Sequence, residues 1–211
     1  MIFKALILEK RVLVYSNKPS AVSNFILALL ALLPGCLHFT MDNSAINLVE
    51  SGLSDFALPL RIFNNKTQLL LYFTINNFPL FDVLEGYLLG TTNSMIKGHK
   101  KAKPDIIVDL DLQKLDIFDE SLKKALSLND SEKEFITNLI KKVSSNISEE
   151  EKKSWKQFEM LKSLNPEWEG SEDWIRQEFS KYLKKMLSEL ALFINYLKTH
   201  KQCTFYLFYL I

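Results

Sequence analysis

Residues 11–35, RVLVYSNKPSAVSNFILALLALLPG, join a strand pattern directly to a helix pattern. The first part, 11–17, is rich in β-branched and aromatic residues and ends in turn formers, which is typical of a strand. In the second part apolar residues recur at helical spacing, Pro19 suits a first helical turn, and Pro34-Gly35 ends the helix. Because this helix is apolar on nearly every face, we expect it to be buried in a core rather than to lie on a surface.

Further strand patterns follow this strand–helix unit. They lie at residues 58–63, 68–75, 86–92 and 105–112. Residues 106–108 form a continuous apolar run, as in a strand covered on both faces, and residues 93–101 predict a short helix. The apolar run at residues 2–8 fits either a helix or a strand. Because strands alternate with helical segments, we predict an α/β fold over residues 1–118, with a mixed or mostly parallel sheet flanked by helices.

The pattern becomes helical from residue 119. Ser131 to Glu134 and Ser148 to Glu151 both match a capping box, and each precedes apolar residues at helical spacing. A long last helix is expected from about Ser171, which suits an N-cap. We therefore expect an all-helical part over residues 119–198, in the same lobe as residues 1–118, and a divergent apolar tail over 199–211.

Two tryptophans, Trp168 and Trp174, flank the start of this last helix. They could form part of a ligand site or pack against the first helical turn, with Gly170 allowing the chain to bend sharply between them. Aromatic side chains bury large areas wherever they occur, so the packing interpretation is favoured.

Composition limits the classes of function. The chain has 211 residues, 47% of them hydrophobic and 24% charged, with a formal net charge of +1. This near-neutral balance, with few arginines, argues against nucleic acid as a partner. The two cysteines, Cys36 and Cys203, favour a reducing compartment over a disulfide framework. The sequence shows no typical signal peptide, and its apolar runs are too short to cross a bilayer, so we expect a cytoplasmic protein that could contact a membrane peripherally.

A search for reactive motifs gives a negative result. The sequence contains no G-x-S-x-G nucleophile elbow, no phosphate-binding P-loop and no dinucleotide fingerprint. Cysteines and histidines also lack zinc-ligand spacing. We therefore expect no catalytic residue, no cofactor, no metal and no small-molecule substrate.

Two charged groups leave alternatives open. Asp105, Asp109 and Asp111 could form a metal site or a carboxylate pair of an enzyme, but solvation of a strand end or edge is favoured. A basic run could bind anionic lipid head groups or an acidic partner, but a solvated loop is favoured. The run consists of Lys97, His99, Lys100, Lys101 and Lys103.

Several stretches, taken in order, resemble the DENN-domain proteins, specifically their late secretory pathway (Avl-type) branch. These stretches are 9-EKRVLVYS-16, 32-LLPG-35, 88-LLGTTN-93, 105-DIIVDLD-111, 168-WEG-170 and 174-WIR-176. The positions that match the branch are Gly90, Thr92, Asn93, Trp168, Gly170, Trp174, Ile175 and Arg176. The set extends over residues 1 to about 190.

The resemblance implies a larger α/β lobe with helices, which in the family follows a small longin-like lobe that we expect to be missing here. It implies a role in vesicle transport, and many family members are guanine-nucleotide exchange factors for Rab GTPases. The expected partner is therefore a Rab-family small GTPase, and the expected location is the cytoplasmic side of Golgi, secretory-vesicle or endosomal membranes. The alternative is a scaffold without exchange activity. Thr92 and Asn93 are the candidate partner contacts, although a polar pair after a strand is usually a helix cap.

Overall fold

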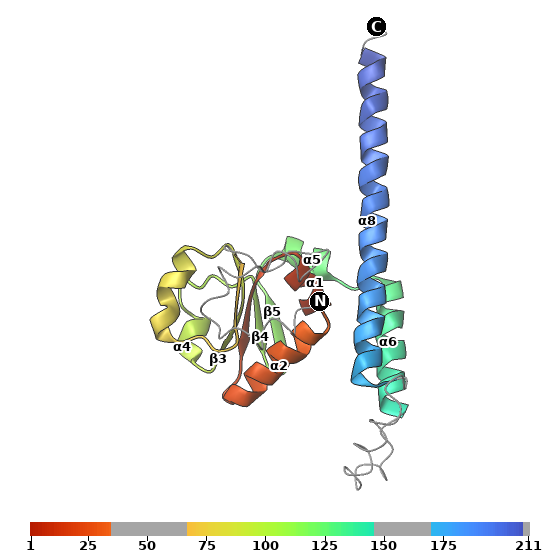
Figure 1. Cartoon of the computed structure of the whole chain (residues 1–211). Helices are drawn as coiled ribbons and strands as arrows, with labels where there is room; N and C mark the ends of the chain where they lie inside the picture. The colour runs from red at the N-terminus through yellow and green to blue at the C-terminus, as the bar shows by residue number, and fades with distance from the viewer. Residues whose placement is uncertain (35–66, 146–169, 209–211) are drawn as a thin grey trace. The chain divides into compact units, whose positions relative to one another are not determined.

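The computed structural model describes residues 1–34, 67–145 and 170–208 (Figure 1). The chain divides into two compact units, Met1–Lys141 and Lys142–Ile211, and each is described by itself. The predicted strand at 58–63, the second capping box at Ser148 and the side chain of Trp168 lie outside the described residues.

The first unit is built on a five-stranded sheet, counted within the described residues, with the order β2-β3-β1-β4-β5. Its strands are β1 (Arg11–Tyr15), β2 (Thr67–Leu70), β3 (Gly86–Thr91), β4 (Ile106–Asp109) and β5 (Lys114–Ile117). The first four are parallel, and β5 is antiparallel to β4. The predicted α/β fold with a mixed, mostly parallel sheet is confirmed.

Helices cover both faces of this sheet (Figure 1). The helix α2 (Pro19–Ala31) packs on one face against β3 and β1. It comes so close that a Cβ atom on Gly90 would overlap the side chains of Val22 and Ile26. The 3-10 helix η2 (Ile75–Asp82) and the short α4 (Ser94–Lys97) contribute to a core on the other face. That core contains Leu13, Leu70, Phe73, Phe81, Tyr87, Leu89, Ile96, Ala102 and Ile107.

Several predicted elements differ from the observed ones. Residues 2–8 form a helix, α1 (Ile2–Ile7), rather than a strand. The helix after β1 was expected to be buried in a core rather than to lie on a surface, but only one of its faces is buried: α2 buries Val22, Ile26, Leu29 and Leu30 and leaves Ala28 exposed. The strand predicted at 68–75 ends at Leu70. The strand predicted at 105–112 ends at Asp109, and the turn after it leads into β5, which the sequence pattern did not reveal.

Two helices follow β5, namely α5 (Glu120–Leu126) and α6 (Asp130–Ser145). The capping box of α6 lies two residues before the predicted one. Asn129 Oδ1 accepts from the Glu132 N–H at 2.8 Å, and Glu132 Oε2 accepts from the Asn129 N–H at 2.9 Å. Glu132 also pairs with Lys4 of α1 at 2.8 Å, and Lys4 donates to the Ser127 carbonyl oxygen at 3.0 Å. The residue that caps α6 therefore also connects α6 to α1.

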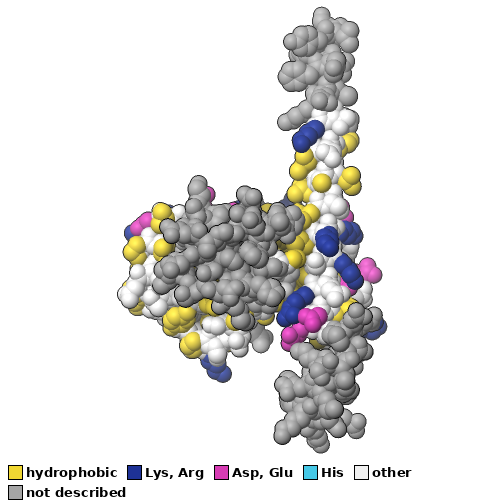
Figure 2. Space-filling view, viewed as in Figure 1, with side chains coloured by type: hydrophobic (Ala, Val, Ile, Leu, Met, Phe, Trp, Pro, Cys, Tyr) yellow, Lys and Arg dark blue, Asp and Glu magenta, His cyan; other side chains and the backbone are white. Residues whose placement is uncertain are grey.

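The second unit contains the long helix α8 (Glu172–Phe208). Ser171 caps it as predicted, since Ser171 Oγ accepts from the Trp174 N–H at 3.1 Å. Gly170 has a φ of 98°, which confirms the sharp bend before the cap. Trp174 is half-buried, so its packing role stays a prediction. Figure 2 shows hydrophobic side chains at the surface of α8, and they include Leu190, Phe193, Ile194 and Leu197. No helix in the described parts of the chain is long and apolar enough to span a membrane.

The displaced capping box can be tested by mutation. We expect Asn129→Ala to lower the free energy of unfolding by about 1 kcal/mol, because the Glu132 N–H loses its acceptor. Ser131→Ala is the comparison, since Ser131 is exposed, lies one residue inside the helix and donates its hydroxyl to Asn129 Oδ1 at 2.8 Å, while Asn129 keeps its bond from the Glu132 N–H. Its expected effect is below about 0.5 kcal/mol. Urea denaturation followed by circular dichroism measures both, and a larger loss for Ser131→Ala would return the cap to its predicted place.

Candidate functional site

The carboxyl ends of the parallel strands form the candidate site. Tyr15, the last residue of β1, lies in register with Thr91 of β3 and Asp109 of β4. The segments that follow β1 and β3 lead to α2 and α4, which pack on opposite faces of the sheet. In open α/β sheets, such a switch point is where ligands usually bind. We call this region the carboxyl edge; its polar residues are Ser16, Asn17, Thr92, Asn93, Lys97, Asp109 and Asp111.

Asp111 fills the position in front of α2. Its Oδ1 accepts from Ser16 Oγ at 2.7 Å, and its Oδ2 accepts from the Asn17 N–H at 2.7 Å. The loop before a helix N-terminus is where an α/β sheet commonly holds a phosphate, because backbone N–H groups and the helix dipole favour negative charge there. Here the protein's own carboxylate accepts from two donors of this loop, the Ser16 hydroxyl and the Asn17 N–H.

Asp109 and Lys97 form an ion pair at the centre of the carboxyl edge. Lys97 Nζ lies 2.5 Å from Asp109 Oδ2 and 4.3 Å from the centroid of the Tyr15 ring. The Leu112 N–H donates to Asp109 Oδ1 at 3.0 Å. Asp109 is only 3% exposed, and the hydrogen bond from Lys97, followed by those from backbone N–H groups, lowers the pKa of its carboxyl. The pair therefore joins α4 to the end of β4 with both carboxylate oxygens in use.

Thr92 and Asn93, the two predicted partner contacts, are half-buried at this edge. Asn93 is the N-cap of α4, because its Oδ1 accepts from the Met95 N–H at 2.9 Å. Thr92 Oγ1 lies 2.9 Å from the hydroxyl oxygen of Tyr72. Asn93 thus acts as the helix cap that the sequence also allowed, and a role of either residue in partner binding stays a prediction.

The three aspartates do not form one cluster. Asp105 precedes β4 and binds Arg11, with Oδ1 2.6 Å from Nη2 and Oδ2 accepting from Nε at 3.1 Å. Burial raises the pKa of Asp105, but the hydrogen bonds from Arg11 outweigh it, and the pKa lies below its usual value. Asp109 and Asp111 serve the separate contacts described above. No group of three or more potential metal ligands occurs among the described side chains.

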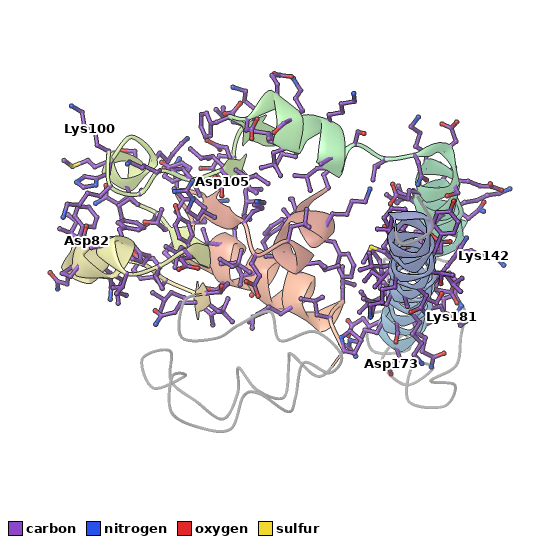
Figure 3. All side chains as sticks on the ribbon, turned by 90° about the horizontal axis from the view of Figure 1, so that it is seen from above. Asp82, Lys100, Asp105, Lys142, Asp173 and Lys181 are labelled. Carbon is purple, nitrogen blue, oxygen red and sulfur yellow. The ribbon has the colours of Figure 1, made fainter. Side chains whose placement is uncertain are left out.

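The basic run is also divided among different contacts. Lys97 pairs with Asp109, Lys101 pairs with Asp82 at 2.9 Å, and the ring of His99 lies 4.3 Å from that of Phe78. Figure 3 shows Lys100 projecting from the outer side of the unit. The side chains of Lys97 and Lys101 are thus paired with carboxylates, and binding of the run to an anionic surface stays a prediction.

Sequence reasoning missed the Asp111 contacts with Ser16 and Asn17, and the pairing of Lys97 with Asp109. The signal was present in part, since Ser16-Asn17 directly follows a strand pattern, as Thr92-Asn93 does. The partners could not be assigned, because the contacting residues are far apart in the sequence. Together these contacts join the elements that meet at the carboxyl edge. No buried side-chain polar atom in the described parts of the chain lacks a hydrogen-bond partner.

The contribution of the Lys97–Asp109 ion pair to stability can be tested by mutation. We expect Lys97→Met to lower the free energy of unfolding by about 2–3 kcal/mol, somewhat less than for a fully buried pair because Lys97 keeps part of its water. Lys101→Met is the matched control, since its pair with Asp82 is exposed and contributes about 0–1 kcal/mol. Urea denaturation distinguishes the two variants, and equal losses would contradict a structural role for the Lys97 pair.

The lowered pKa of Asp109 makes a prediction for pH dependence. A carboxyl whose pKa is lower in the folded than in the unfolded state stabilises the fold above its unfolded pKa of about 3.9 and loses this contribution as the pH falls below it. Between pH 6 and pH 3, the stability of the wild type should therefore fall more steeply than that of Asp109→Asn. Urea denaturation at a series of pH values measures the two slopes, and parallel curves would contradict the prediction.

Comparison with known proteins places the chain in a family. The family model described as Transport protein Avl9 matches residues 1–190. The late secretory pathway protein AVL9 of Saccharomyces cerevisiae is 28% identical over 223 aligned positions, covering 96% of this chain and 28% of the yeast protein. The late secretory pathway protein avl9 of Schizosaccharomyces pombe is 28% identical over 220 positions, covering 94% of this chain and 43% of that protein.

The chain thus spans less than half the length of either of these relatives. No solved structure matches it significantly. The family match covers most of the chain, including the sheet, the whole carboxyl edge and the start of α8. The chain therefore belongs to the Avl9 family of transport proteins.

Proposed function

We propose that the chain regulates a Rab-type small GTPase in vesicle transport on the late secretory or endosomal route, by promoting guanine-nucleotide exchange through a protein interface. The observation on which the proposal rests is membership of the Avl9 family over residues 1–190. The two yeast relatives are named as late secretory pathway proteins. Two further parts of the proposal, the GTPase as partner and the exchange activity, come from the resemblance to DENN-domain proteins.

The chemistry of the carboxyl edge is compatible with this proposal. An exchange factor makes and breaks no covalent bonds, so it needs no acid, base or nucleophile. It binds the nucleotide-free GTPase more tightly than the loaded one, and by linkage it weakens nucleotide binding by the same factor. The GTPase loops that hold phosphate and Mg²⁺ are the element to be displaced. Such a role needs no reactive group, and at the carboxyl edge the side chains of Asp109, Asp111 and Lys97 bond to other protein groups.

A scaffold without exchange activity is the second candidate function. The chain spans 28% and 43% of the two relatives, so the activity of a whole relative need not reside in this part. For either function the proposed location is the cytoplasmic face of Golgi, secretory-vesicle or endosomal membranes.

The two functions can be separated by nucleotide release. A panel of Rab GTPases loaded with fluorescent GDP is mixed with the 211-residue chain, and binding to the nucleotide-free forms is measured in parallel. Exchange activity predicts faster release from at least one Rab and an affinity for GDP lowered about 5–150-fold, a typical coupling. Binding without acceleration would favour the scaffold. Neither binding nor acceleration for any Rab would contradict the exchange activity and leave the scaffold, which need not bind a Rab, as the remaining candidate.

A further inference from the structure

The long helix α8 carries one continuous apolar patch. Six large apolar side chains between residues 190 and 197 are exposed, and all of them belong to this single helix. We call them the α8 patch; its members are Leu190, Leu192, Phe193, Ile194, Tyr196 and Leu197. Residues three or four positions apart on a helix are neighbours, so these side chains adjoin one another, and Figure 2 shows hydrophobic side chains gathered along α8. Contiguous apolar surface of this kind usually marks an interaction site.

The spacing of the apolar residues in α8 is that of a coiled-coil seam. Six of them follow one another in alternating steps of four and three positions. They are Phe179, Leu183, Met186, Leu190, Phe193 and Leu197. A repeat of about 3.5 residues keeps such a seam facing a second helix along its whole length. The pattern therefore indicates that the partner of this face is another helix.

Only the first part of the seam is covered within the chain. Leu183 is 3% exposed, and Phe179 and Met186 are half-buried. The last part is open, since Phe193 is 57% and Leu197 43% exposed. The α8 patch thus continues, on the same seam, an apolar contact that the chain already buries at Leu183.

The charge and the size of the α8 patch favour a second copy of the chain as the occupant. No charged residue occurs between Glu189 and Lys198, so two copies of the patch can meet without like-charge repulsion. A two-fold contact of this kind uses the same patch twice. A large aromatic side chain can bury about 150–250 Å². Because the six members are roughly half exposed, two patches together can bury on the order of 1,000 Å², the lower limit for a specific interface.

The opposite face of α8 disfavours a membrane as the occupant. A helix that lies in a membrane interface presents a strongly charged or polar face to water. Across the length of the α8 patch, the face opposite the seam carries Ala191, Leu192 and Asn195. None of these residues is charged, so this part of α8 lacks the face that an interfacial helix needs.

We propose that α8 pairs with α8 of a second copy of the chain, through the seam residues Leu190, Phe193 and Leu197 with Ile194 and Tyr196 beside them. Each seam side chain fits between four residues of the facing helix, as in a coiled coil. Leu192 lies outside this contact, although it is the most exposed member of the α8 patch. The pairing does not depend on whether the chain acts on a GTPase.

The test compares two neighbouring substitutions in the 211-residue chain. Phe193→Gln removes the central seam residue, and Leu192→Gln is the matched control, because Leu192 is at least as exposed but points away from the seam. Glutamine is a good helix former, so neither variant should break α8. Sedimentation equilibrium measures the dimer dissociation constant from about 1 to 100 µM, where an interface of this size should associate. We expect Phe193→Gln to weaken the dimer about tenfold or more and Leu192→Gln to stay within about twofold of the wild type.

Three outcomes would overturn the pairing. A wild-type chain that stays monomeric over the whole concentration range has no second copy on this seam. Equal losses in the two variants would indicate unspecific apolar association, and a dimer that neither variant weakens would place the contact elsewhere. Vesicles of phosphatidylserine and phosphatidylcholine test a membrane as the occupant. Vesicle binding by a monomeric wild type that is lost in Phe193→Gln would assign the seam to a membrane instead.

A second measurement needs no variant. Hydrogen exchange of the wild-type chain should slow at residues 187–199 as the protein concentration rises, because pairing protects this part of α8 from opening. Protection that appears only in other segments would contradict the pairing. Circular dichroism of both variants at the lowest concentration should match that of the wild type, since both side chains are exposed.

Discussion

The pairing of β1 on both of its edges is the constraint on which the first unit depends. Val12, Leu13 and Val14 have no exposed surface, and β3 and β4 take up the hydrogen-bonding groups on either side. Contacts at the two ends secure this arrangement. Arg11 binds Asp105 at the amino end, and Ser16 and Asn17 bind Asp111 at the carboxyl end. A slip of one residue would exchange the two faces of the strand and break both sets of contacts.

Those parts of the fold that depend on local patterns could be predicted from the sequence. The strand at 11–15, the helix that begins at Pro19 and the Ser171 cap were found because their signals lie within a few residues of the element. The capping box of α6 shows the limit of this reasoning. Both Asn129–Glu132 and Ser131–Glu134 match a capping box, and the structure forms the first. Its Glu132 also pairs with Lys4 of α1. No local pattern contains that contact.

The candidate site was predicted in its residues but not in its geometry. Thr92, Asn93, Lys97, Asp109 and Asp111 were all singled out, and the cap made by Asn93 is local. The partners of the other four lie in other elements, and Ser16 is 95 positions from Asp111. Asp105 was grouped with the other two aspartates because the three are close in sequence, whereas Asp105 precedes β4 and Asp109 ends it, so they lie at opposite edges of the sheet. Met95 and Leu112 resemble core residues in the sequence. Only the structure shows that they face solvent beside the polar contacts of the carboxyl edge.

The strand order also bears on how the chain is made. β1 and the apolar α2 leave the ribosome before both neighbours of β1, which are encoded later, the nearer one beginning at Gly86. At roughly 5–20 residues per second, the nascent strand waits for several seconds before either neighbour exists. During that interval its unpaired edges and the hydrophobic residues of the helix are open to misassociation. Production of this protein in cells should therefore depend on chaperones that bind nascent chains.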